Sequence, residues 1–339
     1  MLARSLTLEL DGKVVGKTPM LVPAFSSKAD PSIGLIMESL EEYLSGPILV
    51  SAYDIKYNKS MKLPVNFGDP IFLDSGGYEC SMDTDLADTA LSNYRPEKWT
   101  RVEHGDVVDS WPNNRPTIVV SYDHPSSRNA IKAQADVAQA FFRGRTKILT
   151  EILLKPETED QHYIELKSIL GNLEALRAFD VIGITEKELG WNLLQRLENV
   201  AKIRMAMNEL DIHKPLHLFG SLDPIACPLF FIAGADIFDG LTWLRYAFID
   251  GLAVYEHHYG VIRQPYDYHY RRIRIQRLVD NLAELNRTRQ QMVNYLMDGN
   301  FKHFQHLRKP ADYFKPHQDL IRDVHTALQS QLGARGKEV

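Results

Sequence analysis

Three apolar segments of this sequence end in aspartate, and carboxylates placed in this way can do chemistry. The segments are Phe72–Tyr78, Val119–His124 and Ala235–Gly240, and they carry Asp74, Asp123, Asp236 and Asp239. A carboxylate buried behind an apolar strand must be hydrogen-bonded, ion-paired or catalytic, because leaving it unpaired is costly. A single one is often the cap of the next helix. Three that converge on one site favour a functional interpretation.

Grouped carboxylates suit displacement at the anomeric carbon of a sugar. One carboxylate attacks the sugar, a second donates and later removes a proton, and a third reads the edge of a base. Crowding separates their pKa values, so that one stays ionised while another holds a proton. Ser75, Gly76 and Gly77 follow Asp74 directly. Adjacent glycines let the backbone approach a ligand closely, although a plain tight turn explains them equally well.

The elements that must position these residues alternate between short apolar runs and longer helical patterns. We expect strands at Pro19–Phe25, Pro47–Tyr53, Pro70–Asp74, Thr117–Asp123, Lys147–Leu154, Val181–Thr185, Pro215–Gly220 and Ala235–Leu241. We expect helices at Asp30–Leu44, Ser126–Arg143, Asp160–Arg177, Trp191–Leu210 and Pro224–Ala233. Eight such repeats predict a closed α/β barrel, the (β/α)8 TIM fold, with the active site at the carboxyl ends of the strands.

Two segments fall outside the repeat. The long, irregular stretch Tyr78–Pro116 after the third strand, with Asp83, Asp85, Asp88, Trp99 and Trp111, is predicted to be an insertion or lid. After the eighth strand, Asp280–Leu296 has helical spacing and Gly299 is its expected stop. We therefore expect a barrel over residues 1–305 and a C-terminal helical tail over 306–339, with a helix near His317–Leu328.

Composition limits the partners. The net charge of -5 rules out a basic field over the whole chain, so a polyanion would have to meet a local patch. The densest candidate is formed by Arg263, Arg271, Arg272, Arg274 and Arg277 beside Tyr266, Tyr268 and Tyr270. A solvated, charged start of a helix is the alternative interpretation. Two cysteines, no apolar membrane span and no secretory signal indicate a cytoplasmic protein.

Several motifs, taken in order along the chain, resemble those of tRNA-guanine transglycosylases. Asp74-Ser75-Gly76-Gly77-Tyr78 is similar to the family's Asp-Ser-Gly-Gly-aromatic motif, and Gly234-Ala235-Asp236-Ile237-Phe238-Asp239 to its nucleophile segment. Four further segments of the chain resemble segments of the family, namely Thr18–Pro23, Ser121-Tyr122-Asp123, His217–Gly220 and Asp280–Phe304. The resemblance spans residues 18 to about 305 and implies the same barrel.

The resemblance also implies roles for individual residues. Asp239 would attack C1′ of the sugar, Asp74 would be the general acid and base, and Asp123 would hold the guanine edge. The pocket for the base would be lined by Ser75, Gly76, Gly77, Tyr78 and Gly183. The incoming substrate would be a free 7-deazaguanine base. The family's members commonly pair, so a homodimer or a protein partner is a further expectation.

The chain departs from the family at several places. It lacks the cysteines of the family's zinc subdomain, and His257, His258 and His269 have poor ligand spacing, so we expect no metal and no cofactor. Leu153-Leu154-Lys155 stands where the family has Gln-Gly, and Gly183-Ile184 where it has two glycines. Tyr78-Glu79 replaces aromatic-Gln, which with the missing zinc region favours the branch that modifies DNA over the one that modifies tRNA.

Three alternatives remain from the sequence. The first is a tRNA-guanine transglycosylase with a reduced C-terminus. The second is a hydrolytic nucleosidase or glycosidase, in which water resolves the glycosyl intermediate. The third is a non-catalytic barrel subunit that partners an active paralogue, a reading weakened by the presence of both Asp74 and Asp239.

Overall fold

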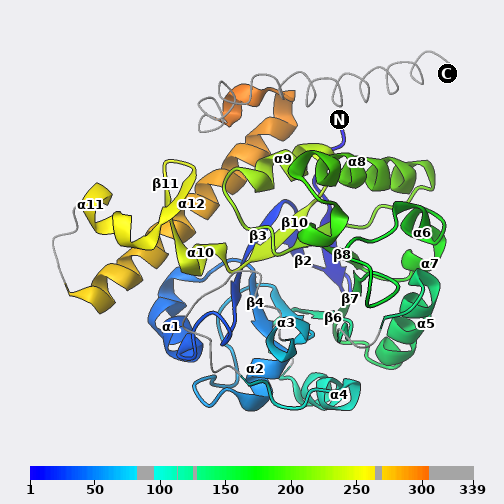
Figure 1. The fold of residues 1–339 in the computed structure, drawn as a ribbon, viewed down its shortest axis with the longest axis horizontal. Helices are drawn as coiled ribbons and strands as arrows, with labels where there is room; N and C mark the ends of the chain where they lie inside the picture. The colour runs from blue at the N-terminus through cyan, green and yellow to red at the C-terminus, as the bar shows by residue number, and fades with distance from the viewer. Residues whose placement is uncertain (82–94, 113, 125–127, 264–268, 305–339) are drawn as a thin grey trace.

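The computed structural model describes residues 1–81, 95–112, 114–124, 128–263 and 269–304, and its centre is a closed barrel of eight parallel strands (Figure 1). The barrel strands are β3 (Met20–Phe25), β4 (Ile48–Ser51), β5 (Ile71–Asp74), β6 (Thr117–Val120), β7 (Leu149–Leu154), β8 (Val181–Thr185), β9 (Leu216–Phe219) and β10 (Ile237–Gly240). They follow one another in chain order, and β10 closes the ring by pairing with β3. The (β/α)8 barrel expected from the sequence is confirmed.

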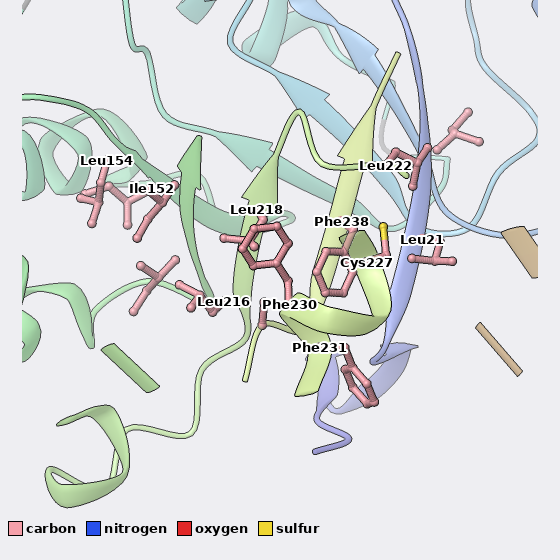
Figure 2. Packing of buried hydrophobic residues seen from close by; sticks show 14 of the residues in the cluster. Leu21, Ile152, Leu154, Leu216, Leu218, Leu222, Cys227, Phe230, Phe231 and Phe238 are labelled. Atoms are coloured by element: carbon pink, nitrogen blue, oxygen red, sulfur yellow. The ribbon is translucent and has the colours of Figure 1, made fainter. Parts of the chain in front are cut away.

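Alternate residues of the barrel strands face two separate hydrophobic layers, as the pleat requires. Phe72, Val120, Leu149 and Ile237 belong to the cluster inside the barrel. Their chain neighbours point outward into the layer beneath the helices. Figure 2 shows part of this outer layer, in which Cys227, Phe230 and Phe231 of one helix lie against strands that carry Leu21, Leu218 and Phe238. Asp74 and Asp239 lie two residues after Phe72 and Ile237, so they share the inward parity.

Helices cover the outside of the barrel. The structure contains α1 (Ile33–Leu40), α2 (Ala52–Tyr57), α3 (Gly77–Cys80), α4 (Arg101–Ser110), α5 (Ile131–Phe142), α6 (Leu166–Leu170), α7 (Leu173–Leu176), α8 (Leu193–Glu209) and α9 (Ala226–Ala233). Short 3₁₀ turns are η1 (Glu41–Tyr43) and η3 (Glu186–Leu189). The single helix predicted over Asp160–Arg177 is wrong, because two short helices meet at Gly171-Asn172. The strand predicted over Pro47–Tyr53 ends early, because α2 begins at Ala52.

A hairpin not predicted from the sequence lies at the amino-terminal end of the barrel. β1 (Thr7–Leu10) pairs antiparallel with β2 (Lys13–Lys17) through the two-residue turn Asp11-Gly12. Leu8 joins the cluster inside the barrel, and Leu10 and Val15 pack against it. The hairpin therefore plugs this end of the barrel and leaves the other rim for a site.

The chain after β10 forms a second missed hairpin and a long helix. The elements are α10 (Thr242–Arg245), β11 (Tyr246–Ile249), β12 (Leu252–Tyr255), η4 (Glu256–His258), α11 (Tyr259–Arg263), α12 (Tyr270–Asp298) and η5 (Phe301–His303). The β11–β12 hairpin, α11 and the start of α12 project from one side of the barrel (Figure 1). Gly299 ends α12 in the left-handed conformation, as predicted. The proposed tail helix near His317–Leu328 lies outside the described residues.

The stretch after β5 is more regular than its composition suggests. Asp83, Asp85 and Asp88 lie outside the described residues. Beyond them α4 begins at Arg101, and the Thr100 side chain accepts a hydrogen bond from the backbone N–H of Glu103. Trp99 and Trp111 are buried in the outer layer. The second half of this segment is thus part of the helical cover, contrary to the irregular loop expected.

Candidate active site

The structure brings Asp74, Asp123 and Asp239 to the same rim of the barrel. Asp74 is the last residue of β5, Asp239 lies near the end of β10, and Asp123 follows the end of β6 by three residues. Because all eight strands are parallel, these positions share the carboxyl-end rim, where barrel enzymes carry their active sites. Asp236 is separate from this group. It lies at the start of β10, fully buried, and is paired with Arg204 and with the backbone N–H of Leu216.

Asp74 is suited to carry a proton. Its side chain is buried, and its Oδ2 accepts a hydrogen bond from the backbone N–H of Gly76 at 3.1 Å. Burial raises the pKa of Asp74 well above its usual value, and the charges of Glu79, Asp123 and Asp239 raise it further. A carboxyl group in such surroundings stays neutral when its neighbours are ionised. The geometry therefore favours Asp74 as a general acid.

Glu79 is a buried acidic residue whose charge acts on Asp74. No role in the chemistry was predicted for it from the sequence. The Ser51 hydroxyl donates to Oε2 of Glu79 at 2.8 Å, and the Ser26 hydroxyl donates to Oε1. Burial also raises the pKa of Glu79. Its carboxylate is held by two hydroxyl groups, and its charge raises the pKa of Asp74.

The turn Ser75-Gly76-Gly77 holds the two aspartates together. The Ser75 hydroxyl donates to Oδ1 of Asp123, and the Gly77 N–H donates to Ser75 Oγ at 3.2 Å. Gly76 has φ +81°, which favours glycine, and a Cβ at Gly77 would overlap the carboxylate of Asp123. The close approach of Asp123 therefore requires glycine at position 77. The amide groups of Gly76 and Gly77 donate to Asp74 and Ser75.

Asp123 has a cationic neighbour, Lys155, and the contact between them was not expected from the sequence. Lys155 Nζ, just beyond β7, lies 3.6 Å from Oδ2 of Asp123. It also donates to Thr185 Oγ1 at 2.7 Å and lies 3.3 Å from Glu188. Asp123 and Lys155 share a small pocket with Arg101 and Arg128. This side of the rim thus presents an acceptor and a donor next to each other.

Asp239 is anchored through one oxygen. The Gly220 N–H donates to Oδ1 at 3.1 Å, and His217 Nε2 lies 3.4 Å from the same atom. His217 Nδ1 is in turn 2.7 Å from Oε1 of Glu151 on β7. Both contacts of Asp239 within the described part of the chain use Oδ1. Charged residues within otherwise apolar strands were the available signal for Glu151 and His217.

Gly183 of β8 has a packing reason to be glycine. A Cβ there would lie 2.6 Å from the Phe219 ring and 2.9 Å from Oε1 of Glu151. The position predicted to line the base pocket is therefore filled by these two side chains from neighbouring strands.

Tyr78 lies in α3 next to the glycine turn. Lys28 Nζ is 4.2 Å from the centroid of its ring and donates to its carbonyl oxygen at 2.8 Å. Arg245 of α10 donates to the Tyr78 hydroxyl at 3.1 Å. Tyr78 thereby connects the rim to the segment that leads into the β11–β12 hairpin.

The arginine patch divides into surface and structural members. Arg277 is buried and donates to the carbonyl oxygens of Tyr246 and Leu244 at 2.6 and 3.0 Å. Arg274 pairs with Asp30 of the segment before α1. Arg272 is exposed, and Arg263 lies 3.8 Å from Asp250 with its side chain partly exposed. The backbone of Arg271 lies in the first turn of α12. Arg263 and Arg272 are therefore the members that lie at the surface among the residues whose side chains the structure describes.

The described residues contain no group of three or more histidine, cysteine or acidic side chains able to hold a metal ion. His257 and His258 lie in η4, where the ring of His257 stacks on that of Tyr255.

Among the described residues, no helix is both long enough and apolar enough to cross a bilayer.

No protein-family model matches the sequence, and no curated protein matches it at a significant level.

Proposed function

We propose that this protein exchanges a guanine base in a nucleic acid for a 7-deazaguanine through a glycosyl ester on Asp239. The proposal is supported chiefly by two carboxyl groups that lie at the same rim of the barrel. Asp74 is buried and its raised pKa favours the neutral form, whereas Asp239 lies beside His217. One carboxyl group thus holds a proton while the other keeps a free oxygen. Displacement at C1′ requires these two states together.

In the first half of the reaction, Oδ2 of Asp239 forms a bond to C1′. The C1′–N9 bond breaks, its electron pair goes to the departing guanine, and Asp74 gives that base a proton. In the second half, N9 of the incoming base attacks C1′ and gives its proton to Asp74. The ester bond breaks and its electron pair returns to Asp239. Both carboxyl groups end in their starting states.

Asp123 and Lys155 suit the recognition of a guanine-type edge. Asp123 can accept from the N1–H and amino groups, and Lys155 can donate to the carbonyl oxygen. Tyr78 and the projecting β11–β12 hairpin extend from the rim toward Arg263 and Arg272, which would contact the phosphate backbone. The resemblance of the motifs to tRNA-guanine transglycosylases supports the same assignment.

We place DNA ahead of tRNA as the polymer, on the strength of Glu79 at the end of the aspartate motif and the missing zinc subdomain. The target base would have to leave the duplex or be presented in a single strand. The test incubates the protein with labelled 7-deazaguanine and either DNA or tRNA, with Asp239→Asn as the control. Label in DNA supports the proposal, and label in tRNA alone reassigns the polymer. Release of guanine without incorporation indicates a hydrolase, and no reaction with either polymer overturns the proposal.

A further inference from the structure

Three side chains form a chain of contacts across the inside of the barrel. His217 is the second residue of β9, with its Nδ1 2.7 Å from Oε1 of Glu151 and its Nε2 3.4 Å from Oδ1 of Asp239. Glu151 and His217 are completely buried. The carboxylates approach the ring from opposite sides, because β7 and β10 flank the pair formed by β8 and β9.

Aromatic packing fixes the plane of the His217 ring. Phe219 stacks on it with a centroid distance of 4.0 Å, and Phe72 meets it edge to face at 5.4 Å. The β8 residue beside this cluster is Gly183, where any side chain would strike Phe219 or Glu151. The ring is thus held in one orientation, with one nitrogen toward each carboxylate.

We propose that Glu151 and His217 are a positioning pair for the nucleophile Asp239, and this inference rests on the proposed function. Glu151 accepts from Nδ1–H and fixes the ring, so that Nε2–H faces Oδ1 of Asp239. The Gly220 N–H donates to the same oxygen. With Oδ1 bonded to the Gly220 N–H and 3.4 Å from the His217 ring nitrogen, Oδ2 is the oxygen that attacks C1′.

The pair acts in both halves of the exchange. Before attack, a protonated ring places a positive charge 3.4 Å from Oδ1 of Asp239. After the ester forms at Oδ2, Oδ1 is its carbonyl oxygen and stays next to the same two donors. These donors stabilise the negative charge that returns to the carboxylate when the incoming base breaks the ester. The pair therefore favours ester breakdown in particular.

The charge state of the ring is set by its two acidic neighbours. Burial alone opposes protonation, but the charges of Glu151 and Asp239 outweigh it and raise the pKa of His217 to about 9. Glu151 on β7 and Asp239 on β10 are the titratable groups that act on the ring, whereas β5 contributes Phe72 and β8 contributes Gly183. Removing the Glu151 charge must lower this pKa.

The test compares Glu151→Gln, His217→Phe and wild type in pre-steady-state exchange across pH 6–9. For Glu151→Gln we expect kcat to fall about tenfold at pH 8 with a small change in KM, and to recover toward pH 6, where the ring regains its proton. His217→Phe should lose about a hundredfold in kcat without recovery and should accumulate the glycosyl ester. His104→Phe, which alters a completely buried histidine stacked on Phe141 outside the barrel, is the matched control and should retain activity.

The outcomes separate the two proposals. An inactive wild-type protein overturns the proposed exchange, whereas an active wild type whose pH profile is unchanged by Glu151→Gln overturns the positioning pair. Nitrogen NMR of the imidazole gives a readout that needs no activity. A doubly protonated His217 at pH 8 that becomes neutral in Glu151→Gln supports the pair, and a neutral ring in wild type overturns it.

Discussion

Lys155 Nζ lies 3.6 Å from Oδ2 of Asp123, and the two residues come from the ends of neighbouring strands. Lys155 ends the Leu153-Leu154-Lys155 segment, which stands where the tRNA-guanine transglycosylases that the motifs resemble have Gln-Gly. It therefore places a charged donor on the side of the pocket that would hold the carbonyl group of the base.

We expect Lys155→Met to raise KM for the incoming base roughly tenfold or more, since a hydrogen bond to a charged group contributes about 1.5–3 kcal/mol. kcat should change less, because Lys155 does not touch the reacting atoms. Steady-state kinetics with varied base concentration measures both. Lys202→Met, which removes an exposed lysine paired with Glu198 on α8, is the control. An unchanged KM would contradict the assigned role.

Two aspartates three residues apart, Asp236 just before β10 and Asp239 within it, should behave in opposite ways. Asp239→Asn should reduce exchange by ~10³-fold or more with little loss of stability, because it removes the nucleophile. Asp236→Asn should lower the free energy of unfolding by about 3 kcal/mol, because it leaves the buried Arg204 charge uncompensated. Denaturant titration and activity, measured on both variants, separate the roles. If both variants lost the same amount of stability, Asp239 would have a structural role like that of Asp236.

The pH dependence of exchange should report on Glu79. Its charge helps to raise the pKa of Asp74, and the acid form of Asp74 is needed for guanine release. Activity should therefore fall as pH rises through the pKa of Asp74. Glu79→Gln should move this fall to lower pH, since one raising charge is lost. A profile of kcat/KM against pH checks the direction, and a shift to higher pH would exclude the proposed coupling.

The buried imidazolium should make the folded state sensitive to alkali. The folded pKa of His217 is raised to about 9, above the unfolded value, so its stabilisation is complete at low pH and is lost as pH rises toward 9. The slope should reach up to about 1.4 kcal/mol per pH unit, the value for one proton. Denaturant midpoints between pH 6 and 9 measure it. His217→Phe should flatten this part of the curve.

Adding a methyl group should be disruptive at Gly183 inside the barrel and harmless at Gly46, an exposed glycine before β4. Gly183→Ala would push against Phe219 and Glu151 and should destabilise the protein by about 1–3 kcal/mol. Gly46→Ala has open space around the added carbon and serves as the control. Thermal unfolding measures both. A Gly183→Ala protein as stable as wild type would mean that Phe219 and Glu151 can move to accommodate the added methyl group.

Much of the fold could be predicted from the sequence, because eight apolar runs separated by helical segments leave few arrangements other than a barrel. Both missed hairpins nevertheless carried a signal. Asp11-Gly12 and Asp250-Gly251 each have positive φ at both residues, the conformation of a two-residue hairpin turn that Asp-Gly favours. Thr100 and Glu103 likewise have the spacing of a helix start.

The site was less accessible to sequence reasoning. Asp74, Asp123 and Asp239 could be chosen because each ends an apolar run. Glu151 and His217 lie 66 positions apart, and their contact depends on how β7, β8 and β9 are placed in the closed barrel. The sequence predicts Arg277 to be a surface cation, but its side chain is buried and donates to two backbone carbonyl oxygens.

The β1–β2 hairpin has a kinetic consequence for the proposed exchange. Because Leu8 packs against the residues that fill the barrel interior at its amino-terminal end, the departing and arriving bases would share the carboxyl-end rim. Guanine must then diffuse out before its replacement can enter. Initial-rate plots should consequently show the parallel lines of a ping-pong scheme, with added guanine competing against the incoming base.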